Sequence, residues 1–250
     1  MPSPASVRDG KRADLFLVER GYAASRTEAR RAIEAGTVRI GGTQLLKPSQ
    51  LVPEDAEITY SAAHNYVSRG AVKLAAALDA FQLSPGGNIC LDIGASTGGF
   101  TQLLLERGAR RVYAVDVGQG QLHASLRGDP RIVAMEQCNA RDLSADRIGE
   151  QIDAIVADVS FISLKLALPP ALALARSDTW LVVLVKPQFE VGRANIGKGG
   201  IVRDSRARES ALRAIVDLLP TLGWSVTGAM ESPILGGSGN REYLLAARKP

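Results

Sequence analysis

The sequence contains a glycine-rich turn of a kind that can hold a small ligand. The turn spans Asp92–Phe100 (DIGASTGGF) and follows an apolar run, 89–93, that we expect to be a strand. Glycines allow the backbone to approach a ligand closely, and a helix that begins after the turn offers unpaired N–H groups. The same turn could also be a plain strand-to-helix connection, so its neighbours must decide between the two interpretations.

The residues in and after this turn favour a nucleoside ligand with a positively charged end. The spacing G-x-x-x-G-G lacks the second glycine through which nicotinamide-binding enzymes approach a pyrophosphate. Asp92, directly before the first glycine, suits a cationic amino-acid group, as in S-adenosylmethionine. Asp116 ends the next apolar run about twenty residues later, where a carboxylate can accept hydrogen bonds from ribose hydroxyls.

Two more charged residues directly follow apolar runs. Asp158 comes after 154–157, and Lys186 comes after 181–185. Carboxyl ends of parallel strands share one edge of a sheet, so we expect both side chains beside the glycine-rich turn. A lysine after a buried strand costs desolvation free energy unless it has a partner or a chemical role. A structural ion pair between the two residues is the alternative to a catalytic role.

The elements that must position these residues follow two different patterns. From residue 71 onward, apolar runs alternate with helical segments (122–126 among them), which predicts an α/β fold with a parallel sheet covered on both faces. Residues 11–60 predict a small α+β module, with helices over 14–20 and 26–34 and strands over 38–42 and 51–60. We interpret residues 1–10 as a flexible tail and 61–70 as an interdomain linker.

The charge is concentrated near the amino terminus. Positions 8–47 contain nine Lys or Arg and five Asp or Glu, and nine minus five equals the +4 of the whole chain. This favours a polyanionic partner for the small module. Two cysteines are too few for a thiolate metal site, and no apolar run could span a bilayer. The start of the sequence lacks a signal-peptide pattern, so we expect a cytoplasmic protein without a membrane partner.

Motifs in both parts of the sequence resemble those of a known family. Ser25-Arg26-x-x-Ala29 followed by Glu34-Ala35-Gly36-x-Val38 resembles the RNA-binding module first described in small-subunit ribosomal protein S4. The longer part resembles the TlyA-type ribosomal RNA 2′-O-methyltransferases, which also carry the name hemolysin. Its motifs are 67–74 (VSRGAVKL), 92–100, 157–164 (ADVSFISL), 185–190 (VKPQFE) and 239–243 (GNREY).

The resemblance implies a fold, a cofactor and a catalytic set. The fold would be a Rossmann-like class I methyltransferase with a seven-stranded, mostly parallel sheet over 71–250, after an S4-like domain over 11–60. The cofactor would be S-adenosylmethionine. A Lys-Asp-Lys-Glu tetrad shared with FtsJ-like enzymes would fall on Lys73, Asp158, Lys186 and Glu242. Lys186 would lie nearest the reacting hydroxyl, with Asp158 and Glu242 positioning it, although sequence alone predicts Lys73 and Glu242 to be surface residues.

The resemblance also implies the donor contacts. They would be made by Asp92, Gly94, Ala95, Ser96, Thr97, Gly98, Gly99, Phe100, Asp116, Val117, Asn139, Ala140 and Asp158. In FtsJ-like enzymes an aspartate near the third strand end contacts adenine. The matching position here is Asn139, with Asp142 three residues later, so both residues stay candidates.

The expected partner is ribosomal RNA within ribosomal subunits, with a cytidine ribose as the methyl acceptor. Candidate RNA-binding residues are Arg12, Arg26, Arg30, Arg31, Arg39 and Arg69. We expect a monomer that uses no metal and binds no DNA. The main alternative is a ribosome-associated RNA-binding protein without catalytic activity. A lytic hemolysin or a nicotinamide-dependent dehydrogenase fits the sequence less well.

Overall fold

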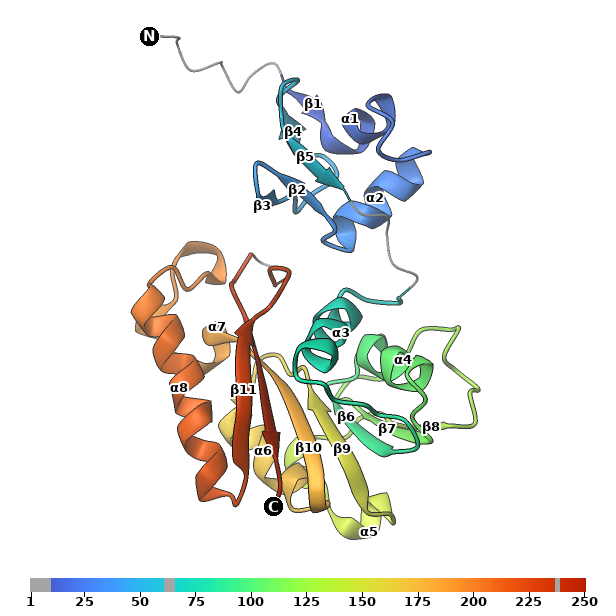
Figure 1. Cartoon of the computed structure of the whole chain (residues 1–250), viewed down its shortest axis with the longest axis vertical. Coiled ribbons are helices and arrows are strands. Elements are labelled where there is room, and N and C mark those ends of the chain that lie inside the picture. Colours follow the sequence, from blue (N-terminus) through green and yellow to red (C-terminus); the bar gives the residue numbers. More distant parts are fainter. Residues whose placement is uncertain (1–9, 61–65, 237–238) are drawn as a thin grey trace. The chain divides into compact units, whose positions relative to one another are not determined.

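The chain divides into two compact units, residues 1–65 and 66–250 (Figure 1). The computed structural model describes residues 10–60, 66–236 and 239–250. Apart from Gly10, the expected tail lies outside the described residues, and so does the first half of the expected linker, 61–65. The second half belongs to the larger unit, where Val67 N donates to Gln102 Oε1 at 2.8 Å.

The smaller unit packs two helices against short antiparallel strands. The helices are α1 (Ala13–Glu19) and α2 (Arg26–Glu34). β1 (Lys11–Arg12) pairs with β4 (Leu51–Val52), and β2 (Val38–Ile40) lies between β3 (Thr43–Gln44) and β5 (Ile58–Tyr60). The single strand expected over 51–60 is wrong. It is two strands, because Pro53 and the turn after it interrupt the extended chain.

Capping chemistry in the sequence explains where α2 begins. Ser25 Oγ accepts a hydrogen bond from Glu28 N at 3.2 Å, and the Glu28 carboxylate accepts one from Ala24 N at 3.0 Å. This reciprocal arrangement satisfies two backbone donors at the helix start. The apolar side of α2, with Ala29 and Ile33, lies in a core of its own within this unit.

The larger unit is built on a seven-stranded sheet in the order β11-β12-β10-β9-β6-β7-β8. Of these seven strands, β12 alone runs in the direction opposite to the other six. The strands are β6 (Ile89–Ile93), β7 (Arg111–Val115), β8 (Ile132–Met135), β9 (Ile152–Ala157), β10 (Ala175–Val185), β11 (Ser225–Glu231) and β12 (Tyr243–Arg248). The expected Rossmann-like sheet of seven mostly parallel strands is therefore confirmed.

Helices cover both faces of this sheet (Figure 1). α3 (Gly70–Ala80) and α4 (Gly99–Glu106) contribute to the apolar core on one face. α6 (Leu164–Leu172) and α8 (Ser205–Thr221) contribute to the core on the other, and α5 (Ala145–Ile148) and α7 (Pro187–Glu190) are short. None of the described helices has the length and apolar character needed to cross a membrane.

The helix expected over 122–126 is wrong, because this segment forms turns. Glycines at 118, 120 and 128 and a proline at 130 surround it, and they favour turns over a helix. The order of the strands reverses between β6 and β9, which are neighbours in the sheet. In open α/β sheets a ligand binds at such a point, outside the carboxyl ends of the strands.

Candidate active site

The turn between β6 and α4 requires its glycines. Gly94 has a φ of +82°, and a Cβ there would lie 2.5 Å from the backbone oxygen of Asp158. Gly98 has a φ of +93°, and a Cβ there would clash with two leucine side chains. Gly94 N donates to Val115 O at 2.8 Å, which ties the turn to the end of β7. The glycines thus allow the ends of β6, β7 and β9 to lie close together.

Asp92 lies beneath this turn, without contact to solvent. Its Oδ2 accepts a hydrogen bond from Thr101 Oγ1 at 2.7 Å, and no described residue donates to Oδ1. Burial, with smaller contributions from Asp158 and Asp116, raises the pKa of Asp92 to about 7. Asp92 does not line either cleft beside the turn, so it supports the turn from below in this conformation.

Asp116 joins the end of β7 to the glycine-rich turn. Its Oδ2 accepts a hydrogen bond from Ser96 N and its Oδ1 one from Gly118 N, both at 2.8 Å. Each carboxylate oxygen has further lone pairs for a ligand hydroxyl. Asp116 lines a cleft of about 800 Å³, together with Gly94, Val117 and other residues. A cleft of this size is large enough for a nucleoside-containing ligand.

The two candidates for the adenine contact lie in different surroundings. Asn139 lines the large cleft, as does Ala140, whereas Asp142 is exposed and does not line it. Asn139 Oδ1 accepts hydrogen bonds from the Arg141 backbone at 3.0 Å and from Arg141 Nε at 3.2 Å. Of the two candidates, Asn139 is therefore better placed to contact a ligand, and its amide nitrogen is the atom that could do so.

Lys186, Asp158 and Ser160 meet at the ends of β10 and β9. Lys186 Nζ forms an ion pair with Asp158 Oδ1 at 2.7 Å and donates to Ser160 Oγ at 2.8 Å. All three line a second cleft, of about 260 Å³, which also includes Gly94, Thr97 and other turn residues. Gly94, Ser96, Asp158 and Ser160 line both clefts, whereas Lys186 lines the smaller one and is bound to two of these shared residues.

Lys73 and Glu242 form a separate, buried pair. Lys73 Nζ on α3 lies 2.5 Å from Oε2 of Glu242, which directly precedes β12, and the two side chains are 7% and 3% exposed. Burial contradicts the surface positions that the sequence alone predicts for them. The described contacts of Glu242 reach Lys73 and not Lys186, so its expected part in positioning Lys186 is not seen. Lys73 itself lines the smaller cleft.

Several site residues carried no signal of their own in the sequence. Ser160 and Thr101 are ordinary hydroxyl residues, and only the fold brings them to Lys186 and Asp92. Phe161 is 92% exposed, with a φ of +63° and its ring centroid 5.2 Å from that of Phe189. An exposed phenylalanine in a left-handed conformation beside a cleft is a structural signal that no spacing rule could supply.

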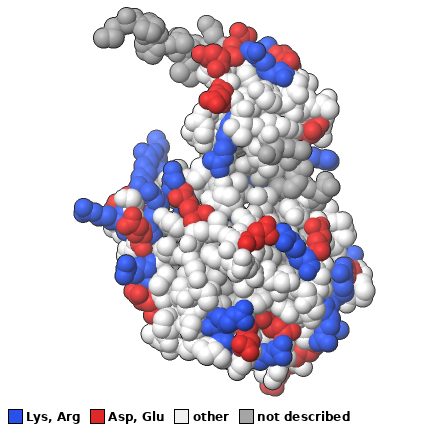
Figure 2. Space-filling view, viewed as in Figure 1, with Lys and Arg blue, Asp and Glu red and all other residues white. Residues whose placement is uncertain are grey.

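The candidate RNA-binding arginines differ in their environments. Arg26, Arg30 and Arg31 on α2 are exposed, and Arg39 Nη1 donates to Gly42 O at 3.1 Å. Arg12 and Arg26 both bind Asp14. In the larger unit, Arg69 lines the smaller cleft. Figure 2 also shows Lys and Arg side chains gathered near the start of α8, where the exposed basic residues are Arg193, Lys198, Arg203 and Arg206.

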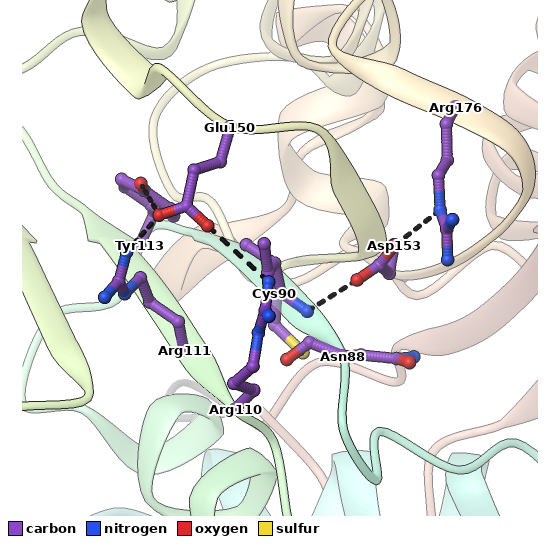
Figure 3. Close-up of polar contacts among 9 residues, drawn as sticks. Asn88, Cys90, Arg110, Arg111, Tyr113, Glu150, Asp153 and Arg176 are labelled. Atoms are coloured by element: carbon purple, nitrogen blue, oxygen red, sulfur yellow. Dashed lines mark hydrogen bonds and ion pairs between the residues drawn. The ribbon is translucent and has the colours of Figure 1, made fainter.

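The opposite edge of the sheet carries charges that are paired locally (Figure 3). Glu150 accepts hydrogen bonds from Tyr113 at 3.1 Å and from Arg111. Asp153 accepts one from Ile89 N at 2.8 Å and forms an ion pair with Arg176 at 2.5 Å. These contacts join the starts of neighbouring strands. Glu150 and Asp153 therefore have structural partners that tie the strands together at this edge.

Comparisons with known proteins agree with this arrangement. Residues 66–249 match the family model described as FtsJ-like methyltransferase, and residues 11–58 match the S4 domain. The chain is 48% identical to the 16S/23S rRNA (cytidine-2′-O)-methyltransferase TlyA of Mycobacterium tuberculosis, over 95% of this chain and 89% of that protein. It is 40% identical to Hemolysin A of Brachyspira hyodysenteriae, over 93% and 98%.

A solved structure is similar over nearly the whole chain. A hemolysin-named protein from Streptococcus thermophilus is 41% identical and aligns with a TM-score of 0.73, covering 96% of this chain and 88% of that one. A more distant structure, an S-adenosylmethionine-dependent methyltransferase from Listeria monocytogenes, is 14% identical with a TM-score of 0.53. At that identity the likeness concerns the fold alone.

Proposed function

The chain belongs to the TlyA-type FtsJ-like methyltransferases with an S4 domain, and from this premise we propose that it methylates a ribose 2′-hydroxyl of ribosomal RNA, with S-adenosylmethionine as donor. The observation that carries the proposal is Lys186, which lines the smaller cleft and is bound to Asp158 and Ser160, two residues that line both this cleft and the nucleoside-sized one. By analogy with the M. tuberculosis relative, the target is a cytidine in a ribosomal subunit.

The larger cleft fits the donor. The closeness of Gly94 to the Asp158 backbone leaves no room for a side chain at the centre of the site. Asp116 would accept hydrogen bonds from the ribose hydroxyls, and Asn139 would contact the adenine. When bound, S-adenosylmethionine supplies a methyl group on a positively charged sulfur, which is already a strong electrophile. The protein therefore has to orient the acceptor hydroxyl and remove its proton.

Lys186 is the residue that would take this proton. In the neutral form its Nζ can accept the proton of the 2′-hydroxyl while the oxygen gains the methyl group. Ser160 and Asp158 hold Nζ at 2.8 and 2.7 Å, which fixes the direction of the amine. Lys73, held by Glu242, would bind the nucleotide from the other side of the smaller cleft. The tetrad would thus act as two pairs, Lys186 with Asp158 and Lys73 with Glu242.

An aromatic surface next to Lys186 would receive the base of the target nucleotide. Lys186 Nζ is 5.9 Å from the centre of the Phe189 ring, which in turn contacts the exposed Phe161. Single-stranded RNA bases commonly stack on exposed aromatic rings. Phosphates would contact the exposed arginines of the S4 domain and the basic residues near the start of α8.

The replacement Lys186→Ala tests this function. We expect methyl transfer to ribosomal RNA to fall about 10²- to 10⁴-fold, because the proton acceptor is lost. Donor binding, measured by titration calorimetry, should remain close to that of the wild type. Lys165→Ala, at an exposed lysine on α6, is the matched control and should retain full activity. Near-normal turnover in Lys186→Ala would contradict the assignment, and a wild type without transferase activity would favour the non-catalytic RNA-binding alternative.

A further inference from the structure

A fully buried carboxylate in the S4 domain binds two of the exposed arginines. Asp14, in the first turn of α1, accepts hydrogen bonds from Arg12 Nε at 3.0 Å and Nη2 at 3.1 Å, and from Arg26 Nη2 at 2.9 Å. Leu15 N also donates to it, at 3.1 Å. The Asp14 side chain is 0% exposed, whereas those of Arg12 and Arg26 are 46% and 56% exposed.

This arrangement fixes two guanidinium groups from separate elements. Arg12 precedes α1 and contacts Asp14 through two nitrogens at once, and Arg26 begins α2. The hydrogen bonds from Arg12 hold the pKa of Asp14 well below its usual range, against the effect of burial. The carboxylate therefore stays charged and keeps both arginines in place over the whole physiological pH range.

The cluster of Asp14, Arg12 and Arg26 has more positive charge than a structural ion pair requires. One arginine would neutralise the buried carboxylate, and the second leaves the cluster with a net charge of +1. An arginine has five N–H donors, and Asp14 uses only two of Arg12 and one of Arg26. The remaining donors belong to half-exposed groups whose orientation is already set. Such a pair loses little conformational entropy when it binds an anion.

We propose that Asp14 is a positioning residue for RNA binding, which holds Arg12 and Arg26 together as one site for a backbone phosphate. Two N–H groups of a guanidinium can bind two oxygens of one phosphate, and the buried Asp14 carboxylate holds the two guanidinium groups in a fixed orientation. The inference rests on the proposed function in one respect, that RNA is the partner of the S4 domain.

The replacement Asp14→Asn separates positioning from simple charge. It raises the formal net charge from +4 to +5, since one negative charge is removed. If the arginines acted only as screened charges, RNA would bind more tightly. If Asp14 positions them, RNA should bind about tenfold more weakly, with a shallower dependence on salt. We would measure the affinity of the full chain for protein-free ribosomal RNA over a range of salt concentrations.

Two further variants complete the experiment. Asp55→Asn makes the same charge change at an exposed residue of the same unit and should bind RNA at least as tightly as the wild type. Arg12→Lys keeps the charge but loses the two-nitrogen contact with Asp14, so it should weaken binding even if Asp14→Asn fails to fold. Circular dichroism of each variant reports folding. Unchanged or tighter binding in folded Asp14→Asn, or wild-type binding in Arg12→Lys, would overturn the proposal.

The same variants distinguish this inference from the proposed function. If the inference alone is wrong, Asp14→Asn will methylate ribosomal RNA with a KM equal to or below that of the wild type. If the proposed function alone is wrong, the wild type will show no methyl transfer but will still bind RNA in an Asp14-dependent way. If both hold, Asp14→Asn will raise KM for RNA and leave donor affinity unchanged, because Asp14 and the donor clefts belong to different units.

Discussion

At the scale of single residues, Asp92 shows how burial changes the role suggested by a charge. Its position before the glycines suggested a contact with a cationic ligand group. The structure places the carboxylate beneath the turn, held by Thr101 and screened from solvent. Since burial raises its pKa to about 7, this residue exchanges protons in the physiological range. In this conformation Asp92 supports the turn, and its contact with the donor stays a prediction.

A measurable pH dependence follows for Asp92. In the unfolded chain the carboxyl loses its proton near its ordinary value of 3.8, and in the folded chain near 7. Between these values the folded state binds more protons, so stability should fall as pH rises through this window and level off above it. Asp92→Asn removes the titrating group and can still accept from Thr101. Its melting temperature should therefore rise relative to the wild type between about pH 4 and about pH 7, and a constant difference would contradict the shift.

At the scale of elements, the turn from β6 to α4 brings the two clefts together. Its glycines allow the end of β6 to pass the backbone of Asp158 at the end of β9. Lys186 reaches the same point from the end of β10, and Glu242, directly before the antiparallel β12, binds Lys73, which lines the smaller cleft. Because β12 runs opposite to the other strands, its beginning lies beside their carboxyl ends, and this places Glu242 at that edge of the sheet.

One glycine replacement in this turn and one outside it, between β7 and β8, should separate the effect of crowding from that of backbone strain. Gly128 has a φ of +95° and open space where a Cβ would lie, so Gly128→Ala should lose about 1–2 kcal/mol of stability and keep donor binding. Gly94→Ala adds a contact of 2.5 Å with the Asp158 backbone to a similar strain. It should lose more stability and bind S-adenosylmethionine at least about tenfold more weakly. Equal behaviour of the two variants in chemical denaturation and donor titration would show that crowding is unimportant.

At the scale of the whole molecule, the two units have separate cores. The S4 domain buries Phe16, Leu17 and Ile33 within itself, and the larger unit has apolar clusters on both faces of its sheet. Each described donor-site residue lies in the larger unit, and so do the four tetrad residues. Donor binding and most of the phosphate binding should therefore reside on different parts of the chain.

Removal of the S4 domain tests this separation. A protein of residues 66–250 should fold and bind S-adenosylmethionine with wild-type affinity, because its core and clefts are complete. Its affinity for ribosomal RNA should fall at least about tenfold, since the arginines of α2 are lost while the basic residues near α8 remain. Calorimetry with the donor and a filter-binding assay with RNA would measure the two effects. Loss of donor binding in a folded 66–250 protein would show that the units depend on each other.

The sequence by itself determined the fold class and the strand-end positions of Asp116, Asp158 and Lys186. Alternating apolar runs and glycine spacing are local signals, and parallel strands necessarily bring their carboxyl ends to one edge. The Lys73 and Glu242 assignment came from resemblance to a family, because residues 169 positions apart share no local pattern. Only the tertiary structure decided that these two form a buried pair, that Asp92 lies beneath the turn, and that Asp14 joins two arginines. Burial and pairing depend on which distant elements pack together, and no short-range spacing encodes that.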